Sequence, residues 1–187
     1  MKSEKFAAAW GDIHFISLTL QQTFILSMER RQHNYTEQEA YLKLSAQCAM
    51  SEQCCHDMMR KMRNWQMDTE VAEKVVARLV KEGFINEERY ALAFVRDKFL
   101  YNHWGKVRIE HELKMRHIAP KHIEAGLEEI EEEDNLEALR RLIEKKRPSV
   151  KGKSDYEIKG KLIRFALSRG FEMDDILEVV EGLEFGV

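Results

Sequence analysis

One pattern of apolar residues occurs three times between positions 58 and 183, and it constrains the fold more than any single residue does. The first copy has six apolar positions; adding 51 to each number, and then a further 53, gives apolar residues every time. The positions are Met58, Met62, Met67, Ala72, Val76 and Leu79, then Ile109, Leu113, Ile118, Ile123, Leu127 and Ile130, then Leu162, Ala166, Phe171, Ile176, Val180 and Leu183. A period near fifty residues is typical of stacked helical units, which offer an extended surface to a polymer or a partner protein instead of one deep pocket.

Helix start and stop signals frame these positions. Thr36–Glu39 and Ser154–Glu157 read S/T-x-x-E, the capping box that begins a helix. Pro120 suits a first helical turn, and Gly83 and Gly170 follow helix ends that carry Lys or Arg. No alternating run of four or more residues predicts a strand. The signals predict helices at about 37–50, 53–65 and 69–82, then 87–101, 106–117 and 121–133, then 135–146, 155–169 and 173–184.

The predicted fold is therefore all-α, with three tandem three-helix repeats that form an elongated, curved helical array. The repeats span residues 36–85, 86–134 and 135–187, and residues 1–35 form an N-terminal extension. Its apolar stretch Ile13–Met28 has 16 residues, fewer than the roughly 20 of a membrane span, and no small-x-small cleavage site follows it. We expect neither a membrane span nor a secretion signal, and Met28 is an alternative translation start.

Composition argues against several classes of protein. Charged residues make up 34% of the chain, with two prolines and nine glycines, which favours long helices over a turn-rich β protein. Three cysteines, Cys48, Cys54 and Cys55, leave one without a partner; they indicate a reducing, cytoplasmic home and not a disulfide framework. No G-x-x-x-x-G-K-[ST], G-x-G-x-x-G or G-x-S-x-G motif occurs.

Neither the cysteines nor the histidines predict a reactive site. Cys54-Cys55-His56 lacks the two-residue ligand spacing of paired zinc clusters, so buried apolar cysteines are favoured over a metal site. The second unit holds four histidines but no nucleophile or carboxylate placed to work with them. They are His103, His111, His117 and His122. We expect no catalytic residue, no cofactor and no metal, and we do not expect an enzyme.

The net charge of −3 conceals a strong segregation of charge. Residues 89–121 carry eight Lys or Arg against three Asp or Glu, and residues 140–169 carry eleven against three. Residues 124–134 and 172–184 carry seven and six acids and no base. Solvated helix faces with intrahelical ion pairs would explain this pattern, and so would a basic stripe offered to an anionic partner.

The basic-stripe interpretation predicts sixteen contact residues, for phosphate or for an acidic protein surface. Trp65 and Trp104, by contrast, are expected to pack between helices and not to stack on unpaired bases. The candidates of the middle unit are Arg96, Lys98, Lys106, Arg108, Lys114 and Arg116. The C-terminal candidates are Arg140, Arg141, Lys145, Lys146, Arg147, Lys151, Lys153, Lys159, Lys161 and Arg164.

An ordered set of features runs through Val76–Ile118: a leucine helix ending in Gly-apolar-apolar, an acidic helix start, aromatic-Ala, an aromatic-apolar pair, a glycine and an Ile/Leu helix. The residues are Leu79, Gly83, Phe84, Ile85, Glu87, Glu88, Tyr90, Ala91, Phe94, Val95, Gly105, Ile109 and Leu113. In this order they resemble the central module of the RecX family, the bacterial regulators of RecA recombinase. The resemblance extends over about 35–183, more weakly in the first and third units. Asn86 stands where that family usually has aspartate, and His117 where it usually has glycine.

The resemblance implies a fold and a partner. It implies an elongated, curved protein of three three-helix repeats that binds along the groove of a RecA filament on single-stranded DNA. It also implies suppression of the filament's ATPase, strand-exchange and coprotease activities, and promotion of its disassembly. We expect a non-enzymatic, cytoplasmic, monomeric regulator that contacts the RecA filament and also single-stranded or duplex DNA. Two other classes stay open: a helical-repeat nucleic-acid-binding module, and an unrelated protein-interaction scaffold.

Overall fold

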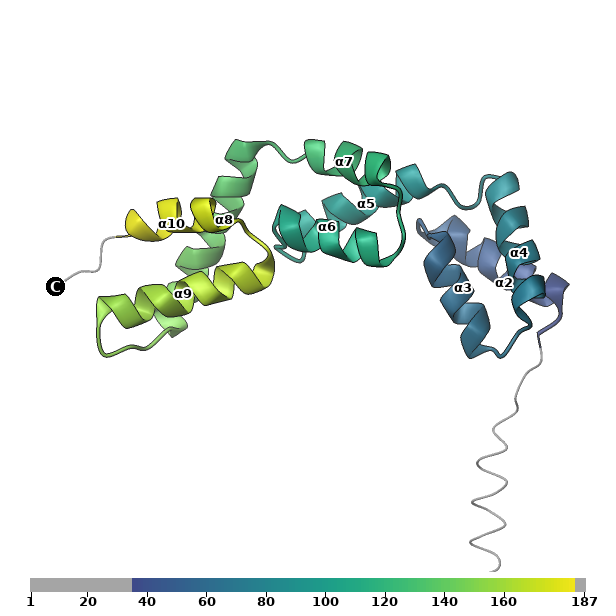
Figure 1. Ribbon diagram of the computed structural model, residues 1–187, viewed down its shortest axis with the longest axis horizontal. Helices are drawn as coiled ribbons and strands as arrows, with labels where there is room; N and C mark the ends of the chain where they lie inside the picture. The colour runs from purple at the N-terminus through teal and green to yellow at the C-terminus, as the bar shows by residue number, and fades with distance from the viewer. Residues whose placement is uncertain (1–34, 184–187) are drawn as a thin grey trace, which may run out of the picture.

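The computed structural model describes residues 35–183, which form nine α-helices, one short 3-10 helix and no strand. The helices follow one another in three groups along an elongated arch (Figure 1). They are α2 (Glu37–Met50), α3 (Cys55–Asn64), α4 (Thr69–Lys81), α5 (Glu87–Leu100), α6 (Lys106–Met115), α7 (Pro120–Glu128), α8 (Glu132–Lys146), η1 (Arg147–Ser149), α9 (Asp155–Arg169) and α10 (Met173–Glu181). The expected all-α array of three-helix repeats is confirmed. The expectations for Ile13–Met28 and for a start at Met28 lie outside the described residues.

Three clusters of buried side chains lie along the arch, one in each group of helices. Met58, Ile109 and Leu162, which are equivalent positions of the repeat, are each fully buried in a different cluster. Fourteen of the eighteen repeat positions are buried, and the other four pack partly buried against the same clusters. Burying one large apolar side chain stabilises a fold by about 1.5–3 kcal/mol, so these positions supply the cohesion of each group. The division of the chain at residues 85/86 and 134/135 stays a prediction.

Most of the expected helix ends form as the sequence indicates. The Thr36 hydroxyl accepts the N–H of Glu39 at 3.3 Å, and the Glu39 carboxylate accepts the N–H of Thr36 at 2.9 Å, which completes a capping box. At the start of α9 the Glu157 carboxylate instead accepts the N–H of Lys153, at 2.9 Å. Asn86 caps α5 by accepting the N–H of Arg89 at 2.9 Å, so the amide fulfils the role of the usual aspartate.

A left-handed residue follows the middle helix of every group. Gln66 and His117 both have φ of +58°, and Gly170 has φ of +86°. These three positions are separated by the repeat offsets of 51 and 53. His117 therefore adopts the left-handed conformation that Gly170 has at the equivalent position, which a residue with a Cβ reaches only at an energetic cost.

The structure corrects the expected boundary between the helices at 121–133 and 135–146. The first of these ends at Glu128, and the second begins at Glu132. Ile130 lies between them, only 5% exposed, because the chain must turn there to place this side chain in the second cluster. Glu131 takes an extended conformation just before α8, whose first turn is acidic, as the dipole of a helix favours.

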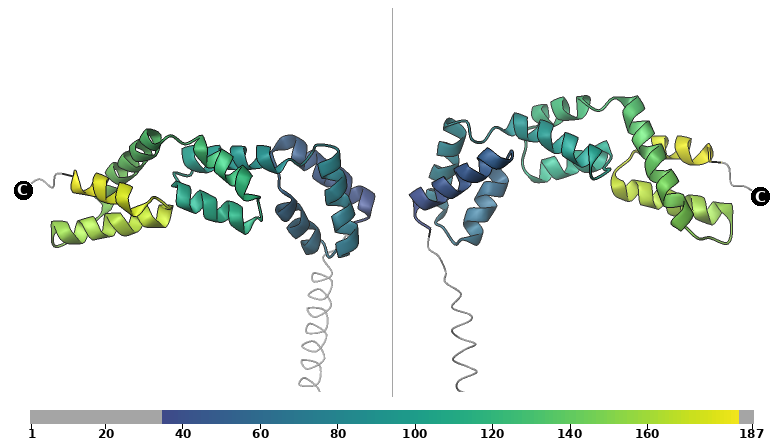
Figure 2. Two further views of the ribbon diagram at one scale, coloured as in Figure 1. Left: turned by 45° about the horizontal axis from the view of Figure 1, so that its top comes forward. Right: turned by 180° about the vertical axis from the view of Figure 1, so that it is seen from behind.

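The middle helices α3, α6 and α9 form one row along the inner side of the arch, which we call the inner row (Figures 1 and 2). The end of α9 meets the start of α6, where the N–H of Gly105 donates to the Arg169 carbonyl at 2.9 Å. The end of α6 meets the start of α3, where the His117 and His56 rings lie 5.1 Å apart. Of the helices between residues 35 and 183, none is long and apolar enough to cross a membrane.

Candidate interaction surface

The inner row carries an excess of basic side chains. Lys and Arg outnumber Asp and Glu by three to one in α3, by three to two in α6 and by four to two in α9. By contrast, α10, the last helix of the third group, has four acids and no base. Because the three middle helices adjoin end to end (Figure 1), the excess of basic residues extends along the whole row as a positive stripe.

Equivalent positions of the repeat place exposed Lys, Arg or His residues on successive helices of the inner row. Arg60, His111 and Arg164 occupy one such position, and all three are exposed. Arg63 and Lys114 occupy another, and both are exposed. Arg60 and Arg63 were not among the sequence candidates, because only segments after residue 88 were singled out as basic. Subtracting the offset of 51 from His111 and Lys114 would have found them.

Three candidates of the middle unit form ion pairs with carboxylates. Arg96 makes two hydrogen bonds to Glu129, at 2.7 and 2.9 Å, and joins α5 to the end of α7. Lys114 pairs with Glu110 at 2.6 Å, and Lys98 pairs with the neighbouring Asp97. Exposed pairs contribute only about 0–1 kcal/mol to stability, so a stronger anion can displace the carboxylate.

Two other middle-unit candidates, Arg108 and Arg116, connect neighbouring groups of helices. The Arg108 guanidinium donates to the Ser168 carbonyl at 3.0 Å and lies 4.1 Å from the centre of the Trp104 ring. Arg116 lies 3.5 Å from the Asp57 carboxylate and 2.7 Å from that of Glu112. Both guanidiniums are therefore engaged at junctions of the arch. Lys106, at the start of α6, makes no hydrogen bond or ion pair with another described side chain.

The C-terminal candidates lie on α8, on η1, on the loop after it and on α9. Three of them pair with carboxylates: Arg140 with Glu178, Arg141 with Glu137, and Lys161 with Glu157. Lys146 lies 5.3 Å from the centre of the Phe165 ring, Arg147 begins η1, and Lys159 lies on α9. Besides Lys146, four of the C-terminal candidates have side chains that form no hydrogen bond or ion pair within residues 35–183. They are Lys145, Lys151, Lys153 and Arg164.

Both tryptophans that the structure describes pack between helices, as expected. Trp65 lies partly buried against the first cluster, with its ring 4.3 Å from that of Tyr35. Trp104 lies partly buried against the second cluster, 6.4 Å from the Phe94 ring. Neither ring stands free for an unpaired base.

The cysteines are apolar packing residues. Cys54 is fully buried in the second cluster, and burial raises the pKa of its thiol to about 11. Burial, reinforced by the Glu87 carboxylate, raises the pKa of Cys55 to about 12, and Cys48 packs half-buried against the first cluster. Uncharged thiols are poor nucleophiles and poor metal ligands. The part of the chain that the structure describes contains no group of three or more His, Cys, Asp or Glu that could hold a metal ion.

Comparison with known proteins gives the same family for two of the three groups of helices. Residues 86–127 match the family described as the second three-helix domain of RecX, and residues 132–180 match the third. The chain is 26% identical over 152 residues to the regulatory protein RecX of Bacillus cytotoxicus, and equally identical to that of Bacillus mycoides. Each match covers 81% of this chain and 56% of the relative, so the chain spans about half the length of these curated relatives.

Solved structures share the fold. A crystal structure of regulatory protein RecX superposes with a TM-score of 0.68 at 18% identity, covering 78% of this chain and 71% of that one. A crystal structure of RecX from Lactobacillus salivarius superposes with a TM-score of 0.64 at 19% identity, covering 78% of this chain and 94% of that one. The arch of three-helix groups is thus shared with these proteins.

Proposed function

We infer the function of this chain from one premise: it belongs to the RecX family. We propose that it is a non-enzymatic regulator that binds the RecA recombinase filament on single-stranded DNA. In this proposal it acts as a monomer in the cytoplasm and inhibits the filament's ATPase, strand-exchange and coprotease activities. The matched relatives are named as regulatory proteins, which supports a regulatory role.

The observation that carries the proposal is the continuous inner row. The helices α3, α6 and α9 have 10, 10 and 15 residues, which at a rise of 1.5 Å per residue gives about 50 Å of helix along the curved row. A surface of that length spans several repeats of a polymer and exceeds what a compact ligand needs. Its excess of cations suits a nucleoprotein filament, which carries phosphates along its whole length.

The repeat explains how such an arch could engage a filament. A filament presents the same subunit surface at regular intervals, and the arch presents equivalent exposed positions on successive middle helices, such as Arg63 and Lys114. Several weak contacts made together bind far more tightly than each alone, because later contacts form within an existing complex. An arch seated in this way would oppose the subunit rearrangements that ATP turnover requires.

A second candidate function is direct binding of single-stranded or duplex DNA, with no role for the recombinase. The same positive stripe favours it. The two functions differ in their response to salt, because neutralising phosphates releases counterions and makes direct DNA binding weaken steeply as salt rises. Binding that depends on recombinase contacts should persist better.

The experiment that tests the proposal follows ATP hydrolysis by the RecA protein of the same host on single-stranded DNA. The full chain is added in amounts below the concentration of RecA, at several salt concentrations. We expect the rate of hydrolysis to fall, and the effect to persist at salt concentrations where the chain no longer binds DNA alone. A rate unchanged at every salt concentration would refute the proposal.

A further inference from the structure

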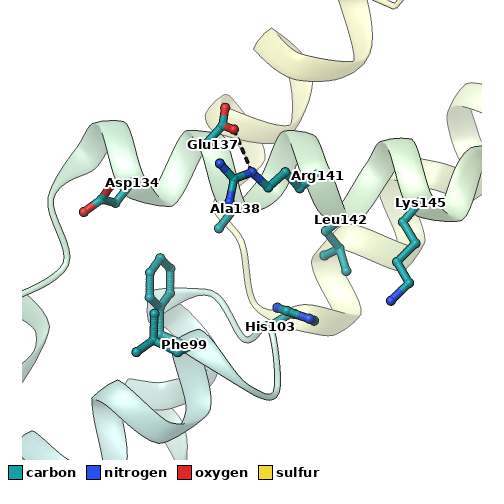
Figure 3. Close-up of a pocket in the computed structure, with 9 residues that line it drawn as sticks. Phe99, His103, Asp134, Glu137, Ala138, Arg141, Leu142 and Lys145 are labelled. Carbon is teal, nitrogen blue, oxygen red and sulfur yellow. Dashed lines mark hydrogen bonds and ion pairs between the residues drawn. The ribbon is translucent and has the colours of Figure 1, made fainter.

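A cleft of about 430 Å³ opens between the second and third groups of helices, and no residue of the inner row lines it. Figure 3 shows its walls: α8 on one side, and the end of α5 with the α5–α6 loop on the other. Its apolar lining includes Phe99, Leu100, Ala138 and Leu142, and Asp134 and Lys145 lie at its two ends. None of the exposed basic residues of the inner row borders this cleft.

The cleft is formed by a second side of α8. One side of this helix is buried in the third group through Asn135, Leu139 and Ile143. The residues that line the cleft recur three or four positions apart from Asp134 to Lys145, so they form a separate stripe along the same helix. A helix with two such stripes contacts its own group on one side and leaves the other for a second partner.

The middle of the cleft is apolar and accessible. Leu100 is 57% exposed, and Phe99, Ala138 and Leu142 are each half-buried. The neighbouring Tyr101 is 78% exposed. Apolar side chains gathered in a hollow are typical of a place where a partner inserts an apolar side chain of its own.

The two ends of the cleft have opposite charge. Asp134 lies at one end and Lys145 at the other, and within residues 35–183 neither side chain forms a hydrogen bond or ion pair. Between them Glu137 and Arg141 pair with each other at 2.7 Å (Figure 3). The dipole of α8 accounts for the sign at each end, but it does not account for the exposed apolar residues in between.

The distance between Asp134 and Lys145 gives the length of a ligand that reaches both. Lys145 follows Asp134 by eleven positions along the helix, which is about 16 Å along the helix axis. An extended peptide covers the same length in about five residues, at roughly 3.3 Å each. Both acidic and basic side chains lie along this lining, so a peptide with groups of both signs suits it better than nucleic acid, whose phosphates would also face Asp134 and Glu137.

We propose that this cleft binds a short segment of the partner protein, with an apolar side chain at its centre and a carboxylate opposite Lys145. A basic or neutral group of the segment lies opposite Asp134. This inference rests on the proposed function, because the segment belongs to a subunit of the recombinase filament. The arch then has two contacts of different chemistry: the inner row for the polyanion, and the cleft for one recombinase segment.

The test measures binding of the fluorescently labelled full chain to the filament of the host's RecA on single-stranded DNA. Ala138→Trp fills the cleft, and Lys145→Glu reverses the charge at its end. Ala46→Trp and Lys74→Glu are the matched controls, since both residues are exposed on helices of the first group. We expect each cleft variant to bind about tenfold more weakly, and each control to stay within about twofold of the parent chain. Thermal melting shows whether each variant is folded. If Ala138→Trp does not fold, Lys145→Glu still tests the proposal, because Lys145 is exposed.

A photo-crosslinking amino acid in place of Leu100 identifies the occupant. A crosslink to a recombinase peptide with an acidic residue near an apolar one supports the proposal. A crosslink only to DNA, or only to a second copy of this chain, overturns it. If the parent chain binds the filament and the cleft variants match their controls, the cleft proposal alone fails. If the parent chain does not bind the filament, the proposed function fails and the cleft proposal falls with it.

Discussion

Gly105 and Gly170 meet where α6 begins and α9 ends, and neither has room for a side chain. A Cβ on Gly105 would lie 2.2 Å from the Gly170 carbonyl oxygen, and a Cβ on Gly170 would lie 2.2 Å from the Cβ of Arg108. The carbonyls at the end of α9 accept the N–H groups of Gly105 and Val107, at 2.9 and 3.1 Å. One helix thus caps the next, and the two glycines allow the approach that aligns the inner row.

The first prediction concerns this contact. Gly105→Ala should lower the free energy of unfolding by about 1–3 kcal/mol, because the added methyl group forces the two backbones apart. Gly160→Ala is the control: no atom lies within 4 Å of its Cβ position, and alanine favours a helix over glycine by about 0.5–1 kcal/mol. Urea unfolding should therefore give opposite signs for the two variants. Equal stability of the two would contradict the close approach of α6 and α9.

His117 gives a second prediction. Its left-handed backbone costs roughly 1–2 kcal/mol, which glycine would avoid, although glycine also gains freedom in the unfolded chain. His117→Gly should therefore raise the stability by about 0.5–1 kcal/mol. His111→Gly, in the middle of α6, should lower it by about as much. Chemical denaturation of both variants checks the sign, and a loss of stability at His117 would show that its ring contact with His56 outweighs the backbone.

The ion pairs at the junction of α3 and α6 predict a dependence on pH. The hydrogen bond from Arg116 holds the pKa of Glu112 below its ordinary value of 4.5. Because the pKa is lower in the folded chain than in the unfolded one, the pair stabilises the fold above about pH 4.5 and loses this effect as the pH falls.

Arg116→Gln should therefore destabilise the chain by about 1–2 kcal/mol at pH 7, and the difference from the parent should shrink below pH 4.5. Lys114→Gln removes an exposed pair on the same helix and should change little. Urea unfolding between pH 3.5 and 7 makes the comparison. A difference that is independent of pH would mean that packing of Arg116 on Phe94 stabilises the junction, and not its charge.

Much of the fold follows from the sequence because its strongest signals are local. The spacing of Met58, Ile109 and Leu162 predicts three similar cores, and Thr36 and Pro120 predict helix starts that the structure confirms. The turn around Ile130 was missed because an acidic run reads as one helix. Helix α7 ends before Ile130 so that this side chain can be buried, and its burial depends on tertiary packing.

The candidate surface was harder to predict, because the partner of a charged side chain is often far away in sequence. No local pattern indicates that Arg116 meets Asp57, or that Arg96 meets Glu129. The alignment of α3, α6 and α9 is also invisible in the sequence, so a stripe confined to the second and third units was expected. The structure extends the row of cations to Arg63 in the first.

The central claim is that the inner row is the surface that meets the filament, and matched charge reversals test it most directly. One variant carries Arg63→Glu, Lys114→Glu and Arg164→Glu on the inner row. The other carries Lys74→Glu, Lys81→Glu and Lys121→Glu on α4 and α7, with the same change in net charge. The measurement is inhibition of RecA ATP hydrolysis on single-stranded DNA at equal concentrations of folded protein. We predict that the inner-row variant inhibits at least about tenfold less well, while the other variant stays close to the parent chain. Equal loss in both variants, or loss only in the second, would contradict the account.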